Sequence, residues 1–199
     1  MSTTDAPPLA PTPRVQRLVS RLPPVHLEAE LPRPDHRWTL RVDGLVERPI
    51  ELSLDELRHL PHAEWVMDLH CVWGWSRRGC RWTGVELETL LDLVRPLPSA
   101  TVVTVGAGQS PYASCLHLTD ARAGVVAWAL DGEPLTQEHG GPLRFVQPSW
   151  LWGYKGVKWA ASITVGDEFT PGFWEAKTGD PEGRVPPEVL LPFDPEEAG

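Results

Sequence analysis

Alternating apolar and polar residues predict several short β-strands along the chain. Residues 38–42 alternate and end at an Asp-Gly turn signal, and residues 101–105 are β-branched and lead into a glycine-rich turn. Three further strands are expected at 65–72, 144–146 and 157–165. These runs are short and irregularly spaced, which favours a mixed sheet over a repeated βα arrangement.

Helical periodicity is confined to short segments. Ser53 and Glu56 have the spacing of a capping box, which predicts a helix that ends before Pro61. Apolar residues recur at helical spacing over 84–94, and a Thr-Asp pair is expected to cap a third helix over 119–129. Short helices between mixed strands predict an α+β fold that is rich in β-structure, and they argue against a doubly wound fold.

Composition divides the 199-residue chain into three parts. Residues 1–36 are rich in proline and are expected to form a partly disordered N-terminal arm wrapped on the domain, 37–175 the folded domain, and 176–199 an acidic C-terminal tail. The longest apolar run, 125–130, is far below the roughly 18 residues that cross a bilayer. The first 30 residues contain no apolar leader segment. We therefore expect a soluble, cytoplasmic protein without a membrane span.

Cysteine usage supports the same compartment. Cys71, Cys80 and Cys115 are an odd number and include no Cys-x-x-Cys pair. This pattern excludes a common zinc ribbon and argues against a disulfide scaffold, so a reducing compartment is expected.

Charge is distributed unevenly along the chain. There are 18 basic and 27 acidic residues, a net charge of -9, which argues against nucleic acid or an anionic membrane as the main partner. Three stretches nevertheless contain no acidic residue, 6–27, 69–85 and 139–166, and each carries three Lys or Arg residues. If they converge in the fold, they form a cationic pocket for a small polyanion; chance spacing is the alternative.

Cys71 is the first candidate reactive group. It ends a predicted strand and is followed by Arg77, Arg78 and Arg81, whose charges are expected to favour a thiolate. A thiolate serves as a nucleophile or as a soft metal ligand, and a buried, inert cysteine is the alternative. His70 should point to the opposite face of the strand and pack in the interior.

A second candidate site lies in the glycine-rich segment 131–159. Glycines beside His139 and Arg144 allow backbone amides to approach an anion, which Arg144 can bind through two donors while Lys158 adds a point charge. A phosphate fits this chemistry. The alternative is a pair of hairpin loops with solvated lysines.

Six motifs in a fixed order resemble one known family. They are Cys71-Val72-x-Gly74-Trp75-Ser76, Trp82-Thr83-Gly84-Val85-x-Leu87, Gly132-x-Pro134-Leu135, His139-Gly140-x-Pro142-x-Arg144, Gly153-Tyr154-Lys155-Gly156-Val157-Lys158-Trp159 and Gly172-Phe173-Trp174. With these motifs, the chain from about Trp38 to Trp174, within the domain expected over 37–175, resembles the sulfite-oxidase-type molybdopterin-binding domain, in a short, single-domain bacterial form. In true sulfite oxidases the paired arginines follow the cysteine more closely; here they come two positions later.

The resemblance implies a metal-binding oxidoreductase whose mononuclear molybdenum is held by a pyranopterin dithiolene and the thiolate of Cys71. The cofactor would be bound by His26, His139, Arg144, Lys155, Gly156, Val157 and Lys158. Arg77 and Arg78 would orient an anionic substrate, and Trp73 and Trp75 would form pocket walls unless they pack in the core. The implied reaction is oxygen-atom transfer on a small substrate, such as a sulfur oxyanion or a sulfoxide, with a separate electron-transfer partner.

Two other hypotheses remain open from the sequence. The 10 tryptophans suit a non-catalytic binding module that uses the same fold without a metal, for a carbohydrate or a partner protein. Alternatively, Cys71 is the nucleophile of a thiol enzyme with a histidine base. Bound molybdenum would exclude the binding module, and activity without any metal would favour the thiol enzyme.

Overall fold

The computed structural model describes residues 16–25, 30–33 and 37–190. Its strands are β1 (Arg17–Leu18), β2 (Thr39–Gly44), β3 (Ile50–Ser53), β4 (Ala63–Cys71), β5 (Trp75–Glu86), β6 (Val102–Ala107), β7 (Ala113–His117), β8 (Val125–Leu130), β9 (Glu133–Pro134), β10 (Arg144–Val146) and β11 (Ala160–Gly166). Its helices are α1 (Leu54–His59), α2 (Leu87–Val94), α3 (Leu118–Ala121), α4 (Phe173–Thr178) and α5 (Pro187–Leu190), with the 3₁₀ turns η1 (Gln137–His139) and η2 (Gly153–Lys155).

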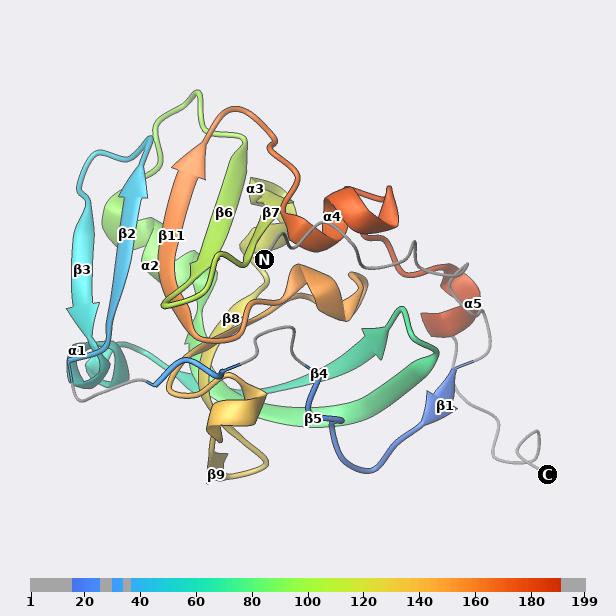
Figure 1. The fold of residues 1–199 in the computed structure, drawn as a ribbon. Helices are drawn as coiled ribbons and strands as arrows, with labels where there is room; N and C mark the ends of the chain where they lie inside the picture. The colour runs from blue at the N-terminus through green and yellow to red at the C-terminus, as the bar shows by residue number, and fades with distance from the viewer. Residues whose placement is uncertain (1–15, 26–29, 34–36, 191–199) are drawn as a thin grey trace.

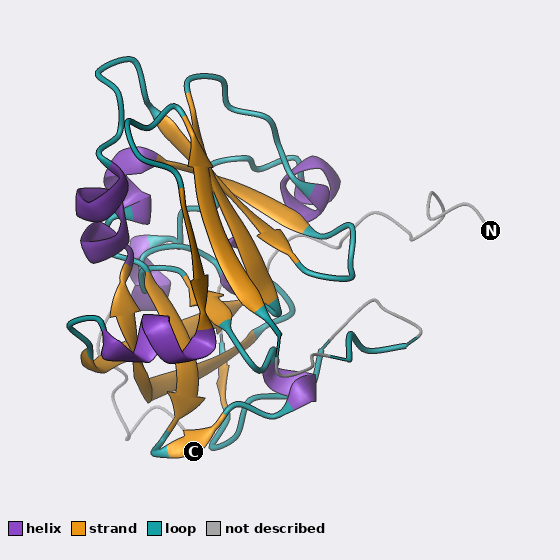
Figure 2. Cartoon of the chain, turned by 90° about the vertical axis from the view of Figure 1, so that its left-hand side faces the viewer, coloured by secondary structure: helices purple, strands orange, loops and turns teal. Residues whose placement is uncertain are grey.

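These strands form two sheets in the described part of the chain. The first has the order β1-β5-β8-β10, with β4 also paired to β5 and β9 to β8; the second has the order β3-β2-β11-β6-β7. The pairs β1–β5 and β2–β11 are parallel, and the other pairs are antiparallel. Figure 2 shows the strands gathered in two groups, with short helices at their margins. The predicted α+β class is confirmed.

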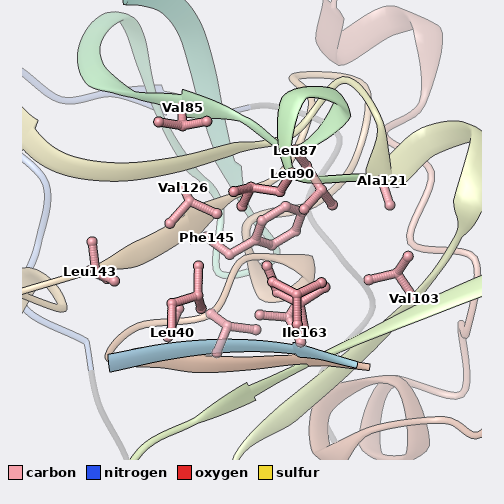
Figure 3. Close-up of a cluster of buried hydrophobic side chains, with 14 of the residues drawn as sticks. Leu40, Val85, Leu87, Leu90, Val103, Ala121, Val126, Leu143, Phe145 and Ile163 are labelled. Atoms are coloured by element: carbon pink, nitrogen blue, oxygen red, sulfur yellow. The ribbon is translucent and has the colours of Figure 1, made fainter. Parts of the chain in front are cut away.

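The main apolar core lies between the two sheets. Leu40 on β2 and Ile163 on β11 face Val126 on β8 and Phe145 on β10, and Leu90 of α2 completes the layer (Figure 3). All five side chains are fully buried. Burial of a large apolar side chain contributes about 1.5–3 kcal/mol, so this layer joins the sheets into one unit.

Most of the predicted elements are present. The predicted strands correspond to β2, β4, β6, β10 and β11. The capping box of α1 is also confirmed: Glu56 N donates to Ser53 Oγ at 3.3 Å, and Ser53 N donates to the Glu56 carboxylate at 2.9 Å. These local signals correspond to local contacts, which is why sequence alone reveals them.

The helix predicted over 119–129 is wrong, since α3 ends at Ala121 and residues 125–130 form β8. This strand lies between β5 and β10 and is largely buried, so its continuous apolar run suits a central strand as well as a helix. The second predicted helix begins at Leu87 rather than Gly84, because the preceding residues continue β5. β5 itself was not predicted, since its arginines and glycines disrupt the strand pattern.

Both ends of the described chain are packed against the domain. Arg17 N donates to Gly74 O and Val19 N donates to Ser76 O, each at 2.9 Å, so β1 extends the first sheet. Val185, within the stretch predicted to be an acidic tail, is buried beside α5. The three-part division stays a prediction, although residues 176–190 are folded. None of the described helices is long and apolar enough to span a membrane.

Candidate active site

A cleft lies where five segments of the chain meet. These segments are the arm, the β4–β5 hairpin, the β6–β7 connection with Tyr112, the region from β10 to Trp159, and α4. Figure 1 shows α4 and the orange turn of η2 above the hairpin of β4 and β5. The cleft is lined by Leu22, Pro23, Val25, Leu69, Cys71, Val72, Trp73, Trp75, Tyr112, Arg144, Gly153, Tyr154, Gly156, Lys158, Trp159 and Trp174.

The cleft is where the acid-free stretches converge. Fourteen of its sixteen lining residues come from those three stretches, the exceptions being Tyr112 and Trp174. No acidic side chain occurs among the described residues that line it. The predicted convergence is therefore confirmed. The positive charge in the lining comes from Arg144 and Lys158, and none of the described arginines of the other two stretches lines the cleft.

The β4–β5 hairpin presents the Cys71 side chain to the cleft. Gly74 N donates to Cys71 O at 3.0 Å and closes a tight turn, and Gly74 has a φ of +83°, which favours glycine. The preceding His70 is buried on the other side, with Nδ1 2.8 Å from Ser76 Oγ. His70 is therefore a packed histidine, as the alternation of the strand predicts.

The expected stabilisation of a Cys71 thiolate by arginines is wrong for the cofactor-free protein. Burial raises the pKa of the Cys71 thiol to about 11, and the hydrogen bond from the Trp73 backbone amide lowers it only in part. Arg77 does not offset the burial, because it forms an ion pair with Asp131. Cys71 is thus protonated at neutral pH, and a metal ion bound there would displace that proton.

The two arginines predicted to orient substrate do not reach the cleft. Arg77 on β5 is paired with Asp131, and Arg78 Nη2 donates to the carbonyl oxygen of Val189 at 3.4 Å. Neither arginine lines the cleft. Their substrate-binding role is not supported by this arrangement, because both guanidinium groups contact other parts of the chain.

Arg144, by contrast, lies in the cleft wall with only 7% of its surface exposed. Its Nη1 donates to His139 O at 3.2 Å, its guanidinium carbon lies 5.3 Å from the centroid of the Trp82 ring, and its buried Nε has no hydrogen-bond partner. Burial lowers the pKa of Arg144 to about 10, so the group remains charged at neutral pH. A buried guanidinium with an unused donor is suited to bind an anion.

Lys158 and His139 hold the arm against the cleft. Lys158 Nζ donates to Val25 O at 2.6 Å and to Glu138 O at 2.5 Å. His139 Nε2 lies 3.0 Å from Leu22 O. Of these two, only Lys158 also lines the cleft, so the His139 side chain is beside the predicted site rather than in it. His26 lies outside the described residues.

Gly156 and Val157 have different environments although they are adjacent. Gly156 lines the cleft, and a Cβ at this position would lie 2.4 Å from Gln147 Oε1, so a side chain would not fit. Val157 is fully buried in the core, and its backbone exchanges hydrogen bonds of 2.8 and 2.9 Å with Phe145. Gly156 therefore forms part of the cleft surface, whereas Val157 anchors this segment to the core.

Lys155 is turned away from the cleft, contrary to its predicted role in cofactor binding. It is 1% exposed, and its Nζ donates to Glu175 Oε1 at 2.8 Å, to Pro181 O at 2.8 Å and to Cys115 O at 2.5 Å. An ammonium group has three N–H donors, and here all three are used. The residue is thus engaged within the protein and does not offer a donor to a cofactor.

The cleft also contains aromatic residues, some of which the sequence did not single out for the site. Trp73 and Trp75 line it as expected. Tyr112 also lines it, and its hydroxyl donates to Tyr154 O at 2.5 Å. Trp174 packs edge-to-face on Trp73, with ring centroids 6.0 Å apart. The sequence marks Trp174 only as part of the Gly172-Phe173-Trp174 motif, because its place in the cleft depends on a contact across the fold, which one sequence does not reveal.

These residues fit a large anionic cofactor that carries a metal. Within the described residues, no group of three or more His, Cys, Asp or Glu side chains could hold a metal ion. Cys71 could supply one thiolate ligand, which suits a metal that is already bound to an organic group. Arg144 and Lys158, which both line the cleft, match the charge of an anionic organic group.

Comparisons with known proteins agree with this fit. Residues 26–174 match the family described as "Oxidoreductase molybdopterin binding domain". The chain is 38% identical over 151 residues to the "Uncharacterized oxidoreductase YuiH" of Bacillus subtilis, covering 73% of this chain and 75% of that protein. It is 33% identical over 177 residues to the "Protein-methionine-sulfoxide reductase catalytic subunit MsrP" of Gluconobacter oxydans, covering 78% of this chain and 56% of the relative.

A second MsrP subunit, from Xanthomonas axonopodis, is 34% identical over 154 residues, covering 69% of this chain and 47% of the relative. The crystal structure of the sulfane dehydrogenase SoxCD from Paracoccus pantotrophus has a similar fold, with a TM-score of 0.63 and 21% identity over 69% of this chain and 40% of that one. The chain spans about half the length of the MsrP relatives. The predictions of the family and of an enzyme are confirmed: the chain belongs to the oxidoreductase molybdopterin-binding domain family.

Proposed function

We propose that this protein is a molybdenum-cofactor-dependent oxidoreductase that reduces a sulfoxide on a small molecule. In the overall reaction, the sulfoxide, two electrons and two protons give a thioether and water. The observation that carries the proposal is the composition of the cleft. Its lining contains both the Cys71 thiol and the buried guanidinium of Arg144, and it includes no acidic side chain among the described residues. The names of the MsrP relatives support the choice of a sulfoxide.

Different residues of the cleft would contact different parts of the cofactor. Cys71 would supply the protein ligand to the metal, and Arg144 and Lys158 would neutralise the anionic groups of the organic part. Gly156 leaves room beside them. When bound, the molybdenum cofactor supplies two-electron oxygen-atom transfer chemistry. The apolar rings of Trp73, Trp75 and Trp174 would limit access of water to the reacting sulfur.

The electrons would come from a separate protein, and this part of the proposal is supported by the description of both MsrP relatives as catalytic subunits. The thiol-enzyme alternative is disfavoured because burial raises the pKa of Cys71 to about 11. The cytoplasmic location is proposed on the three unpaired cysteines, which suit a reducing compartment.

The test is to express the protein with molybdate and to compare it with Cys71→Ala and Cys115→Ala. Cys115 is a buried thiol away from the cleft lining and serves as the matched control. We expect the wild type and the control to contain molybdenum and to reduce dimethyl sulfoxide with a reduced dye, and Cys71→Ala to lose at least about 100-fold in rate. Full activity in Cys71→Ala, or reaction with sulfite but with no sulfoxide, would contradict the proposal.

A further inference from the structure

A buried ion pair lies directly behind one wall of the cleft. Lys155 on η2 and Glu175 on α4 are each 1% exposed, and Nζ and Oε1 are 2.8 Å apart. Neither residue lines the cleft. The pair is therefore separate from the groups that would bind the cofactor or substrate.

The pair connects several segments at one point. Glu175 Oε1 also accepts hydrogen bonds from Ser114 Oγ at 2.6 Å and from Cys115 N at 3.2 Å, both on β7. Lys155 donates to the carbonyl oxygens of Cys115 and Pro181. As a result, α4, η2, β7 and the segment after α4 are tied together through two side chains.

The neighbours of both residues form the cleft wall. Trp174 precedes Glu175 and Tyr154 precedes Lys155, and both aromatic side chains line the cleft. The start of α4 is packed tightly on β7, because a Cβ on Gly172 would lie 2.1 Å from a backbone oxygen of that strand. The position of α4 thus determines the position of the Trp174 ring.

Trp174 in turn supports the most exposed aromatic ring of the cleft lining. It lies edge-to-face against Trp73, which is 46% exposed. The two rings stand beside Cys71 in the lining. A substituent on a sulfur atom that reacts near Cys71 would contact these rings, which offer apolar faces and edges.

We propose that Lys155 and Glu175 are positioning residues that hold the Trp174–Trp73 wall of the cleft, and that this wall selects substrates by the apolar group attached to the sulfur. The selection of substrate rests on the proposed function; the positioning does not. Stability alone accounts poorly for such a pair, because apolar residues of similar volume often stabilise a fold as well as a buried ion pair does. A requirement for a fixed position of the Trp174–Trp73 wall explains why the charged side chains of Lys155 and Glu175 are buried behind it.

The positioning is tested by ¹⁹F NMR of the cofactor-free protein labelled with 5-fluorotryptophan. Trp174→Phe and Trp73→Phe identify the two resonances. We expect Glu175→Gln and the apolar double variant Lys155→Met/Glu175→Leu to shift or broaden both resonances and to leave that of Trp65, on β4, unchanged. Glu182→Gln, which removes an exposed carboxylate near the same segment, is the control.

The outcomes separate a positioning role from a purely structural one. If Glu175→Gln does not fold, the ¹⁹F resonances of the double variant Lys155→Met/Glu175→Leu test the positioning role instead. A folded double variant with unmoved Trp174 and Trp73 resonances would overturn the proposal, and so would the failure of both variants to fold, because the pair would then serve stability alone.

Selection is tested on the cofactor-loaded, folded variant with two sulfoxides of different size. We expect the KM for methyl phenyl sulfoxide to rise about fivefold, with kcat within about twofold, and the KM for dimethyl sulfoxide to stay within about twofold. Equal changes for both substrates would overturn the selection. If the wild type reduces no sulfoxide, the proposed function fails, while the ¹⁹F measurement still decides the positioning.

Discussion

Arg144 and Lys155 are both buried cations from the same acid-free stretch, yet their surroundings differ. Lys155 uses all three of its donors and faces the carboxylate of Glu175. Arg144 lines the cleft, has no ion pair among the described residues, makes one hydrogen bond to a carbonyl oxygen, and has a buried Nε without a hydrogen-bond partner. The comparison teaches that the role of a buried cation depends on what satisfies it, and that its place in a motif is not sufficient to assign that role.

Lys155 and Arg144 also differ in the free-energy cost of burying their charge. At Lys155 the opposite charge and two further acceptors offset the loss of hydration. At Arg144 burial lowers the pKa, which means that the surrounding protein disfavours the charged form relative to water. An anionic ligand would relieve that penalty, whereas Lys155 gains nothing from one.

The largest expected effect is that of Lys155→Met on stability. Removing the ammonium leaves Glu175 buried without its ion-pair partner, which costs about 3–5 kcal/mol. Urea unfolding of the cofactor-free protein measures the change. The double variant Lys155→Met/Glu175→Leu should recover most of the loss, because no unpaired charge remains. A loss below about 1 kcal/mol in the single variant would show that the pair is not effectively buried.

Arg144→Met should behave in the opposite way. Without a cofactor, its free energy of unfolding should stay within about 1 kcal/mol of the wild type, because the variant also removes a poorly satisfied charge. Retention of the cofactor should fall about 10- to 100-fold, corresponding to one lost charge-assisted hydrogen bond. The assay is pterin release during dialysis, followed by fluorescence. Normal retention with strongly reduced stability would make Arg144 a structural cation like Lys155.

Lys158→Met should give an intermediate result, because its ammonium is bound by the neutral carbonyl oxygens of Val25 and Glu138. We expect faster amide hydrogen exchange in residues 16–25 and a loss of about 1 kcal/mol or less in global stability. Arg95→Met, which breaks an exposed pair with Glu47, is the control and should leave the arm unchanged. Unchanged exchange in the arm would show that Lys158 does not hold it.

The sequence predicts the parts of the site that depend on local pattern. Cys71 at the end of a strand and Arg144 in a glycine-flanked segment are both in the cleft, and the acid-free stretches converge there. Lys155 belongs to the same motif as Lys158, but its side chain leaves the cleft because Glu175, twenty residues away, provides a buried partner. A contact of that kind is a property of the packed structure and is absent from the local pattern.

The same reason explains the errors in the fold. The apolar run that forms β8 is compatible with a helix or a strand, and its pairing with β5 and β10 decides between them. β5 carries three arginines, of which Arg77 and Arg81 pair with Asp131 and Glu64. These acids lie in other segments, so the sequence predicts cations around Cys71, whereas the fold pairs these side chains with other parts of the chain.

The smallest expected effect is that of Arg77→Met, which tests whether the arginines of β5 contribute to the reaction. Because Arg77 pairs with the partly exposed Asp131, its loss should lower stability by about 0.2–1 kcal/mol. Cofactor content and the KM for dimethyl sulfoxide should stay within about twofold of the wild type. A double-mutant cycle with Asp131→Asn isolates the energy of the pair. A KM increase above about tenfold confined to anionic sulfur compounds would show that Arg77 turns into the cleft when such a substrate binds, and Arg144 would then not be the only arginine that serves the site.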